Sequence, residues 1–310
     1  MAGPLSLSPP ETSNPSACAF YATNDAYAVA VLVATSRLRK LGIAPDIDIV
    51  ALHHNVSRYI LDSMRGLGIL TVSARPPWPA TVRCFRNSLL KLRIFQLSQY
   101  QRVVYLDADS LPLTNLACLF EVPFSEPVAL PRAYWLPQPC GTSALMVVRP
   151  SAEIWRYLQG WIDDAMATGA DIRCDMDVIN EALRDQIHFL PAEWLSLNGE
   201  WSDRDVATAY GEPDAALAHV QVIHFSDLGK PWFHHPRTVR RLRPNARERY
   251  YDFWREWWTI REELVRARPM LERMRFARLR HQGVIVSWLR HRISFLEDTS
   301  EETRTRSGSR

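Results

Sequence analysis

The sequence has little of what marks several familiar protein classes. Its five cysteines are scattered without a Cys-x-x-Cys pair, so neither a disulfide framework nor a zinc site is indicated, and a reducing compartment is expected. No apolar stretch reaches the roughly 18 to 20 residues that a membrane span needs. The net charge of +3 is too small to indicate a nucleic-acid partner. Residues 1–17 lack a basic region and are broken by Pro and Ser. We therefore expect a disordered tail rather than a signal peptide, and a cytoplasmic protein.

Lysine is also scarce. Only Lys40, Lys91 and Lys230 are lysines among the 37 cationic residues, and the rest are arginines. A lysine ammonium is a compact point charge that suits a single phosphate oxygen, whereas arginine offers a planar fork. The bias makes each lysine a candidate for contact with an anionic ligand.

What the sequence does contain is a regular alternation of strand-like and helix-like segments. The first helix, residues 26–42, has an N-cap signal at residues 23–25 and a stop signal at Gly42. The alternation predicts an α/β fold with a mostly parallel central sheet, flanked by helices, that binds ligands at the carboxyl ends of its strands. No Gly-x-Gly-x-x-Gly follows the first strand, so the usual dinucleotide fold is not supported. Strands are expected at 18–22, 46–52, 68–74, 102–109, 142–148 and 187–191, and further helices at 57–66, 87–100 and 151–167.

The character of the chain changes after the predicted α/β domain, residues 18–243. Residues 244–296 are rich in Arg and Trp, are helix-like, and are interrupted at Pro269. Two interpretations stay open: amphipathic helices that pack on the domain, or a basic surface that contacts a membrane or another protein. Residues 297–310 are expected to be a disordered polar tail. The packing interpretation would bury Trp254, Trp257, Trp258 and Leu264.

Two carboxylates follow an apolar run at the end of the strand that includes residues 103–106. Asp107 and Asp109 are two residues apart, so in an extended backbone their side chains point the same way and can converge on one cation. Mg²⁺ and Mn²⁺ prefer oxygen ligands and leave positions for substrate phosphate oxygens. The alternative is a pair of solvated turn residues, but the preceding strand places the pair where α/β sheets bind ligands.

A second apolar run, residues 220–223, ends in His224, and Lys230 follows six residues later. A histidine after a strand is often an ordinary polar end residue. One run ends in two carboxylates, and the other ends in a histidine that is followed by a lysine. We interpret the two runs as parts of one site.

Five blocks in this order resemble the glycogenin-like branch of glycosyltransferase family 8. They lie at residues 23–27, 89–109, 111–120, 174–180 and 222–232, and the Asp-Ala-Asp and His-Phe-x4-Lys-Pro-Trp blocks are the most specific. The family comprises retaining sugar transferases of the GT-A fold. The resemblance implies a single GT-A type domain over residues 18–243, with a C-terminal helical extension. It also implies a UDP-sugar as donor and Mn²⁺, or Mg²⁺, as cofactor.

The resemblance assigns roles to individual residues. Asp175 and Lys91 are the predicted catalytic residues: Asp175 lies near the donor sugar and acceptor, and Lys91 lies near the donor sugar or its phosphate. The alternatives are that Asp175 is only the N-cap of a helix over residues 176–183, or that Asp171 or Asp177 takes its role. The predicted metal ligands are Asp107, Asp109 and His224, and the predicted donor-binding residues are Thr23, Asn24, Tyr27, Lys91, Ala108 and Lys230.

Three departures from the family pattern concern the sugar and the loop after His224. Asp175-Met176 replaces a common Asp-Gln, and residues 142–144 (Thr-Ser-Ala) replace a common Asn-Ser-Gly. Asp227 stands where a glycine is expected, with Gly229 nearby. The metal and phosphate half of the pattern is intact, so we expect a sugar or acceptor that differs from that of glycogenin.

The predicted function is therefore a retaining, metal-dependent transfer of a hexosyl or pentosyl unit from a UDP-sugar. The acceptor is open among a glycan, a protein and a small molecule. Further candidate partners are a membrane surface or protein at the C-terminal helices and a second copy of the chain; no nucleic acid is expected. A catalytically silent nucleotide-sugar-binding scaffold and a metal-dependent nucleotidyltransferase are the alternatives.

Overall fold

The computed structural model describes residues 13–77, 87–169, 174–205, 208–211 and 213–273. The chain divides into two compact units, Met1–Met274 and Arg275–Arg310, and all described residues belong to the first. Most of the predicted N-terminal tail, the predicted C-terminal tail and the predicted helix beyond residue 273 lie outside the described residues. Within the first unit the first strand begins at Ser16, two residues before the predicted domain boundary. The boundaries at residues 243 and 296 stay predictions.

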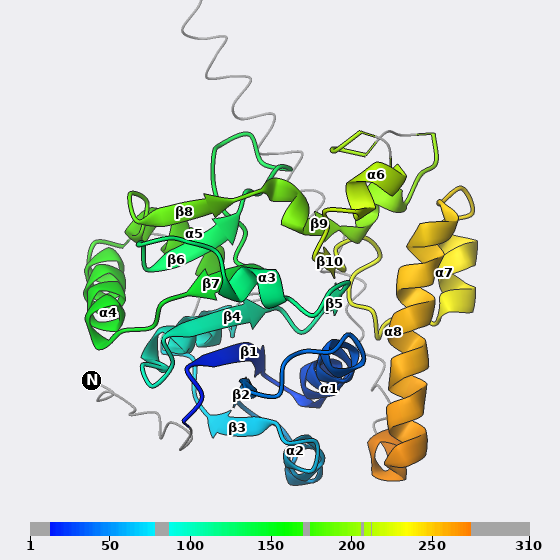
Figure 1. Cartoon of the computed structure of the whole chain (residues 1–310), viewed down its shortest axis with the longest axis horizontal. Coiled ribbons are helices and arrows are strands. Elements are labelled where there is room, and N and C mark those ends of the chain that lie inside the picture. Colours follow the sequence, from blue (N-terminus) through cyan, green and yellow to red (C-terminus); the bar gives the residue numbers. More distant parts are fainter. Residues whose placement is uncertain (1–12, 78–86, 170–173, 206–207, 212, 274–310) are drawn as a thin grey trace, which may run out of the picture. The chain divides into compact units, whose positions relative to one another are not determined.

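A seven-stranded sheet in the order β3-β2-β1-β4-β7-β6-β8 forms the centre of the described unit (Figure 1). β1 pairs in parallel with β2 and β4, and the β2–β3 and β6–β8 pairs are also parallel. β7 runs antiparallel to both β4 and β6. The predicted mostly parallel α/β sheet is thus confirmed. The strands are β1 (Ser16–Ala22), β2 (Ile47–His53), β3 (Leu70–Ser73), β4 (Arg102–Leu106), β6 (Val128–Pro131), β7 (Leu145–Val148) and β8 (Ile187–Leu190).

Both faces of β1 are buried, which explains why it is an unbroken apolar run. Ala17 and Ala19 belong to a core cluster with side chains from the segment 88–96, α4 (Ala152–Ala167) and α5 (Asp175–Ala182). Cys18 and Phe20 alternate with them and are buried on the opposite face, and α1 (Asp25–Lys40) contacts the same strand. The first helix ends as predicted, because Gly42 adopts a left-handed φ of 80°.

One predicted helix is wrong in type. Residues 87–100 were expected to form an α-helix, but the chain forms a shorter 3₁₀ segment, η2 (Ser88–Gln96). Every residue from Ser88 to Phe95 is buried, including Lys91 and Arg93. The segment therefore has no solvent-facing side, and its tertiary contacts override local helix propensity.

Three short strands form a second sheet, in the order β5-β10-β9. β5 (Ser110–Pro112) continues directly from the end of β4, and it pairs antiparallel with β10 (Val222–His224) so that Ser110 faces His224. β9 (Leu195–Leu197) pairs in parallel with β10. This small sheet joins the two apolar runs whose ends carry the candidate ligands.

The described part of the C-terminal segment is a helical hairpin of α7 (Pro236–Leu242) and α8 (Glu248–Ala267). α8 contacts α1 and α7, and its aromatic rings pack edge to face on the domain: Trp254 on Phe225 at 5.1 Å and Phe253 on Trp201 at 5.4 Å. The helix ends shortly before Pro269, as predicted. Trp254, Trp257 and Leu264 are buried as the packing interpretation requires, and Trp258 is half-buried. A membrane or protein contact of this segment stays a prediction.

None of the helices in the described part of the chain combines the length and the apolar character that a membrane crossing needs. The remaining helices and turns are α2 (Arg58–Arg65), α3 (Ala117–Phe120), α6 (Pro213–Leu217), η3 (Ala192–Trp194), η4 (Asn198–Trp201) and η5 (Pro269–Arg273).

Candidate functional site

The link between the two sheets carries the Asp-Ala-Asp sequence. β4 ends at Leu106, and the backbone amide of Asp107 donates to the carbonyl of Ala144, next to the neighbouring strand β7, at 2.9 Å. Ala108 and Asp109 are buried, and the Asp109 carbonyl accepts from the amide of Phe225 at 3.0 Å. The backbone of this turn is therefore held on both sides, and the Asp109 and Asp107 side chains are only 4% and 15% exposed, which contradicts the interpretation as solvated residues.

Asp107, Asp109 and His224 converge. One ligand atom from each lies within 4.8 Å of the others, and His224 Nε2 is 3.4 Å from Asp109 Oδ2 and 3.9 Å from Asp107 Oδ2. Two carboxylate oxygens and one imidazole nitrogen are donors that a divalent ion such as Mn²⁺ accepts. The residues present thus fit the metal that the sequence predicted, and the two apolar runs do end in one site.

Lys230 reaches the same cluster from the loop after β10. Its ammonium group forms an ion pair with Asp109 Oδ2. Burial by itself raises the pKa of Asp109, but Lys230 and His224 more than offset it and hold that pKa well below its usual range. For Asp107, by contrast, burial and the nearby Asp109 carboxylate raise the pKa, although Lys91 opposes the shift. The two carboxylates of the motif thus lie in different electrostatic environments.

Lys91 connects the cluster of Asp107, Asp109 and His224 to Asp175. Its Nζ lies 3.0 Å from Asp107 Oδ1, 2.7 Å from Asp175 Oδ2 and 3.0 Å from the carbonyl oxygen of Ser143, and the side chain is only 3% exposed. Burial lowers the pKa of Lys91, but the two carboxylates outweigh burial and raise the pKa above its usual value. Lys91 therefore carries a positive charge between the buried Asp175 carboxylate and the largely buried Asp107 carboxylate.

Asp175 is the first residue of α5, not its N-cap. The N-cap is Cys174, whose amide donates to Asp177 Oδ2 at 3.1 Å in a capping box. The interpretation of Asp175 as a helix cap is thus wrong, and Asp177 is the residue that does the capping. Asp175 is buried and its Oδ2 accepts from Ser143 Oγ at 2.6 Å. Asp171 lies outside the described residues.

Thr23, Asn24 and Tyr27, the predicted nucleoside contacts, lie at the junction of β1 and α1. Thr23 is buried, and Asn24 Oδ1 caps α1 by accepting from the amides of Ala26 and Tyr27 at 3.0 and 3.2 Å. The Tyr27 ring packs against Trp232 with centroids 5.0 Å apart. Burial raises the pKa of Tyr27 while the Lys230 charge lowers it, so this ring lies within electrostatic reach of the Lys230 ammonium.

Several known proteins are similar to the chain in sequence. No family model matches the chain. It is 32% identical to glucose N-acetyltransferase 1 of Aspergillus fumigatus over 163 residues, which cover 47% of this chain and 42% of that protein. It is 28% identical to glycogenin-1 of Oryctolagus cuniculus over 262 residues, 77% of this chain and 73% of that protein. These similarities agree with the resemblance of the sequence blocks to the glycogenin-like branch of glycosyltransferase family 8.

The solved structures agree with this assignment at the level of the fold. The galactosyltransferase LgtC, determined with donor and acceptor sugar analogues, superimposes with a TM-score of 0.56 at 16% identity, covering 77% of this chain and 95% of that one. The bifunctional glycosyltransferase WbbM gives a TM-score of 0.62 at 14% identity, covering 83% of this chain and 52% of that one. The predicted GT-A fold is confirmed.

The match to the curated relatives is partial. The glucose N-acetyltransferase 1 of Gibberella zeae is 27% identical over 74% of this chain, which is 55% of its own length. Together with the Aspergillus protein, this means that the chain spans about half the length of the glucose N-acetyltransferases it matches.

The candidate site contains residues that sequence reasoning did not assign. Ser143 bonds both Lys91 and Asp175, and the Tyr105 hydroxyl donates to Asp107 Oδ1. The only signal for Ser143 was its place in the departing segment 142–144. Tyr105 reads as an ordinary buried strand residue, so no signal distinguished it.

Proposed function

We propose that the protein is a retaining, metal-dependent glycosyltransferase that moves a hexosyl or pentosyl unit from a UDP-sugar to an acceptor. One observation carries the proposal: Asp107, Asp109 and His224 converge at the carboxyl end of β4, with a charged lysine on each side. Similarity to glycogenin-1 and the shared GT-A fold support the reaction class. The departures from the family pattern at residues 142–144 and at Met176 support a donor or acceptor different from that of glycogenin.

The phosphate half of the site would hold the leaving group. Asp107, Asp109 and His224 are the residues that would bind Mn²⁺ or Mg²⁺. When bound, the ion would neutralise charge that develops on the nucleoside diphosphate. Lys230 stays protonated, since the Asp109 carboxylate outweighs burial and raises its pKa. Its ammonium group would therefore stabilise the same oxygens without a change of protonation.

The sugar half of the site would act through Asp175. Lys91 and the Ser143 hydroxyl hold the Asp175 carboxylate at 2.7 and 2.6 Å, so its orientation is fixed. A fixed carboxylate beside the anomeric carbon stabilises the positive charge of an oxocarbenium-like transition state, as carboxylates do in glycosidases. Tyr27 and Thr23 would contact the nucleoside, and the backbone at Asn24 and Ala108 would complete the donor pocket.

The test is to incubate the full chain with UDP-glucose, UDP-galactose, UDP-xylose and UDP-N-acetylglucosamine, with Mn²⁺ and with a chelator, and to measure free UDP. A parallel reaction contains UTP and a sugar 1-phosphate, and inorganic diphosphate is measured. Mn²⁺-dependent UDP release with one donor supports the proposal. Diphosphate release from UTP would instead identify a nucleotidyltransferase, and nucleotide binding without either product, in the presence of acceptor sugars, would identify a scaffold.

The Asp175→Asn substitution is expected to lower kcat at least about 100-fold, because it removes the charge that faces the reacting sugar. The Kd for UDP, measured by calorimetry with Mn²⁺, should stay close to that of the wild type. Asp177→Asn is the matched control, since it changes a carboxylate two residues away that only caps α5. Equal losses of kcat in both variants would remove Asp175 from the reaction.

The Tyr27→Ala substitution is expected to weaken UDP binding roughly tenfold, because stacking of a base on an aromatic ring contributes about 1–3 kcal/mol. Tyr27→Phe keeps the ring against Trp232 and should bind UDP as the wild type does. A titration of each variant with UDP measures both. An unchanged affinity in Tyr27→Ala would place the base elsewhere.

A further inference from the structure

We propose that Asp227, Arg243 and Tyr250 are positioning residues through which the α7–α8 hairpin holds the loop of Lys230 beside Asp109. The inference concerns a residue that departs from the family pattern, since Asp227 stands where a glycine is common. The role of Lys230 in binding the diphosphate rests on the proposed function, whereas the hold of the hairpin on the loop does not. The residues act on the reaction through Lys230 and touch no reacting atom.

Asp227 is tied to the hairpin by three hydrogen bonds. Arg243, directly after α7, donates from Nη2 to Asp227 Oδ1 at 2.6 Å and from Nε to Oδ2 at 3.0 Å. The Tyr250 hydroxyl, on α8, donates to Oδ2 at 2.6 Å. A bidentate arginine pair is among the strongest and most directional contacts that a side chain makes. A glycine at position 227 would have no group for Arg243 and Tyr250 to bind.

The backbone at the same point is held by a separate side chain. The buried side chain of Asn198 accepts from the amides of Ser226 and Asp227 at 2.8 and 2.9 Å. The chain then turns through two left-handed residues, Leu228 with φ of 58° and Gly229 with φ of 77°. A left-handed leucine is disfavoured and persists only where the surroundings determine the backbone. The hydrogen bonds to the side chain and to the backbone amide of Asp227 supply that constraint immediately before the turn.

The hairpin also holds the chain after Lys230. The Trp258 indole of α8 donates to the carbonyls of Pro231 and His234, both at 3.0 Å. Trp232 packs on Trp257, with centroids 6.3 Å apart, as well as on Tyr27. Lys230 therefore lies between two points of the chain that are hydrogen-bonded to the same helix, α8.

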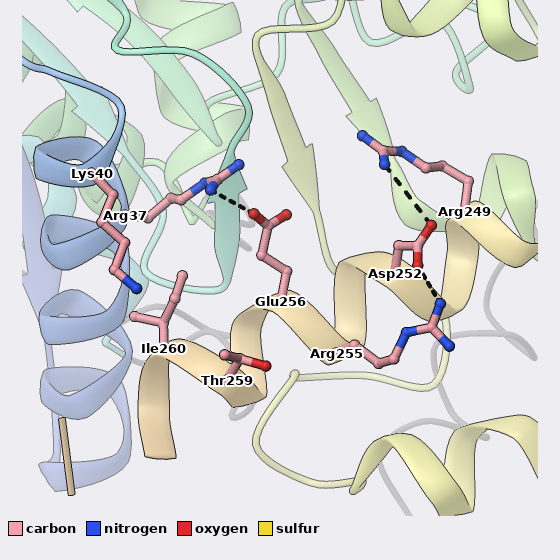
Figure 2. Close-up of a pocket in the computed structure, with 8 residues that line it drawn as sticks. All are labelled: Arg37, Lys40, Arg249, Asp252, Arg255, Glu256, Thr259 and Ile260. Carbon is pink, nitrogen blue, oxygen red and sulfur yellow. Dashed lines mark hydrogen bonds and ion pairs between the residues drawn. The ribbon is translucent and has the colours of Figure 1, made fainter. Parts of the chain in front are cut away.

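α8 is in turn fixed to the rest of the domain. Arg37 of α1 forms an ion pair with Glu256 at 2.5 Å and donates to the carbonyl of Pro112, at the end of β5, at 3.1 Å. Figure 2 shows Arg37 extending from α1 to Glu256 across the groove between the two helices. β5 follows directly on Asp109. Arg37 therefore fixes the hairpin to the strand next to the carboxylate that Lys230 contacts. A lysine on a flexible stem depends on such backbone placement for its precision.

The test uses the full chain with Asp227→Asn, and with Tyr250→Phe as the milder variant. Glu248→Gln is the matched control, because it breaks the Arg240–Glu248 pair of the same hairpin, which does not touch the loop. Hydrogen–deuterium exchange of the peptide covering residues 225–233 reports the loop without any ligand. Calorimetric titration with UDP and with UMP, both with Mn²⁺, reports Lys230, because only UDP carries the second phosphate.

We expect faster exchange in residues 225–233 and a roughly tenfold loss of UDP affinity in Asp227→Asn. UMP affinity should be unchanged, and Tyr250→Phe should show a smaller effect of the same kind. Unchanged exchange would mean that these residues do not hold the loop, and equal losses for UDP and UMP would mean that they do not act through Lys230. Either result would overturn the inference. If the wild type binds neither nucleotide, the proposed function fails, and the exchange experiment still decides whether the hairpin holds the loop.

Discussion

Replacement of Asp109 by asparagine is expected to lower Mn²⁺-dependent UDP release at least about 100-fold. The substitution keeps the shape of the side chain but removes the charge that pairs with Lys230 and lies 3.4 Å from His224. One metal donor and the partner of one lysine are lost together. Initial rates of UDP release at saturating Mn²⁺ and donor measure the effect.

The control for this substitution is Asp62→Asn, an exposed carboxylate on α2 that pairs with Arg65 far from the cluster in sequence. It should release UDP at the wild-type rate. Circular dichroism of both variants shows whether the fold persists. A rate for Asp109→Asn within a few fold of the control would mean that the Asp-Ala-Asp sequence does not bind the catalytic ion.

Replacement of Lys91 by methionine is expected to lower the free energy of unfolding by about 3–5 kcal/mol, the largest stability effect that we predict. Lys91 lies 3.0 Å from Asp107 and 2.7 Å from Asp175, and all three side chains are largely buried. Without the ammonium group, two largely buried carboxylates are left with no cation between them. Urea unfolding followed by circular dichroism measures the loss.

Two further variants make that result specific. Lys40→Met removes an exposed lysine that pairs with Glu263 and should leave the free energy of unfolding nearly unchanged. Adding Asp175→Asn to Lys91→Met should recover part of the lost stability, because one of the two unpaired charges disappears. Equal stability of Lys91→Met and Lys40→Met would contradict the buried ion cluster.

The sequence was informative where local patterns decide the structure. The N-cap at Asn24, the stop at Gly42 and the continuous apolar run of β1 are local signals, and each has the predicted effect. The convergence of Asp107 with His224 was also predicted, because both follow apolar runs. The structure brings them together through the β5–β10 pair of the small sheet, however, and not at one edge of the central sheet.

The parts that the sequence did not predict depend on contacts between distant residues. β5 and β9 have three residues each and are too short for a periodic signal. The 3₁₀ form of η2 follows from its complete burial, which no local pattern encodes. In the sequence Asp227 is only a departure from the family motif. Its role could not be predicted, because its partners Arg243 and Tyr250 come 16 and 23 residues later.

The most direct test of the metal and nucleotide site is an anomalous difference map, collected at the manganese absorption edge from crystals grown with UDP and Mn²⁺. The account predicts one strong peak bounded by Asp107, Asp109 and His224, with the diphosphate between that peak and Lys230. An ordered UDP with its manganese bound elsewhere, or with no anomalous peak between these three side chains, would contradict it.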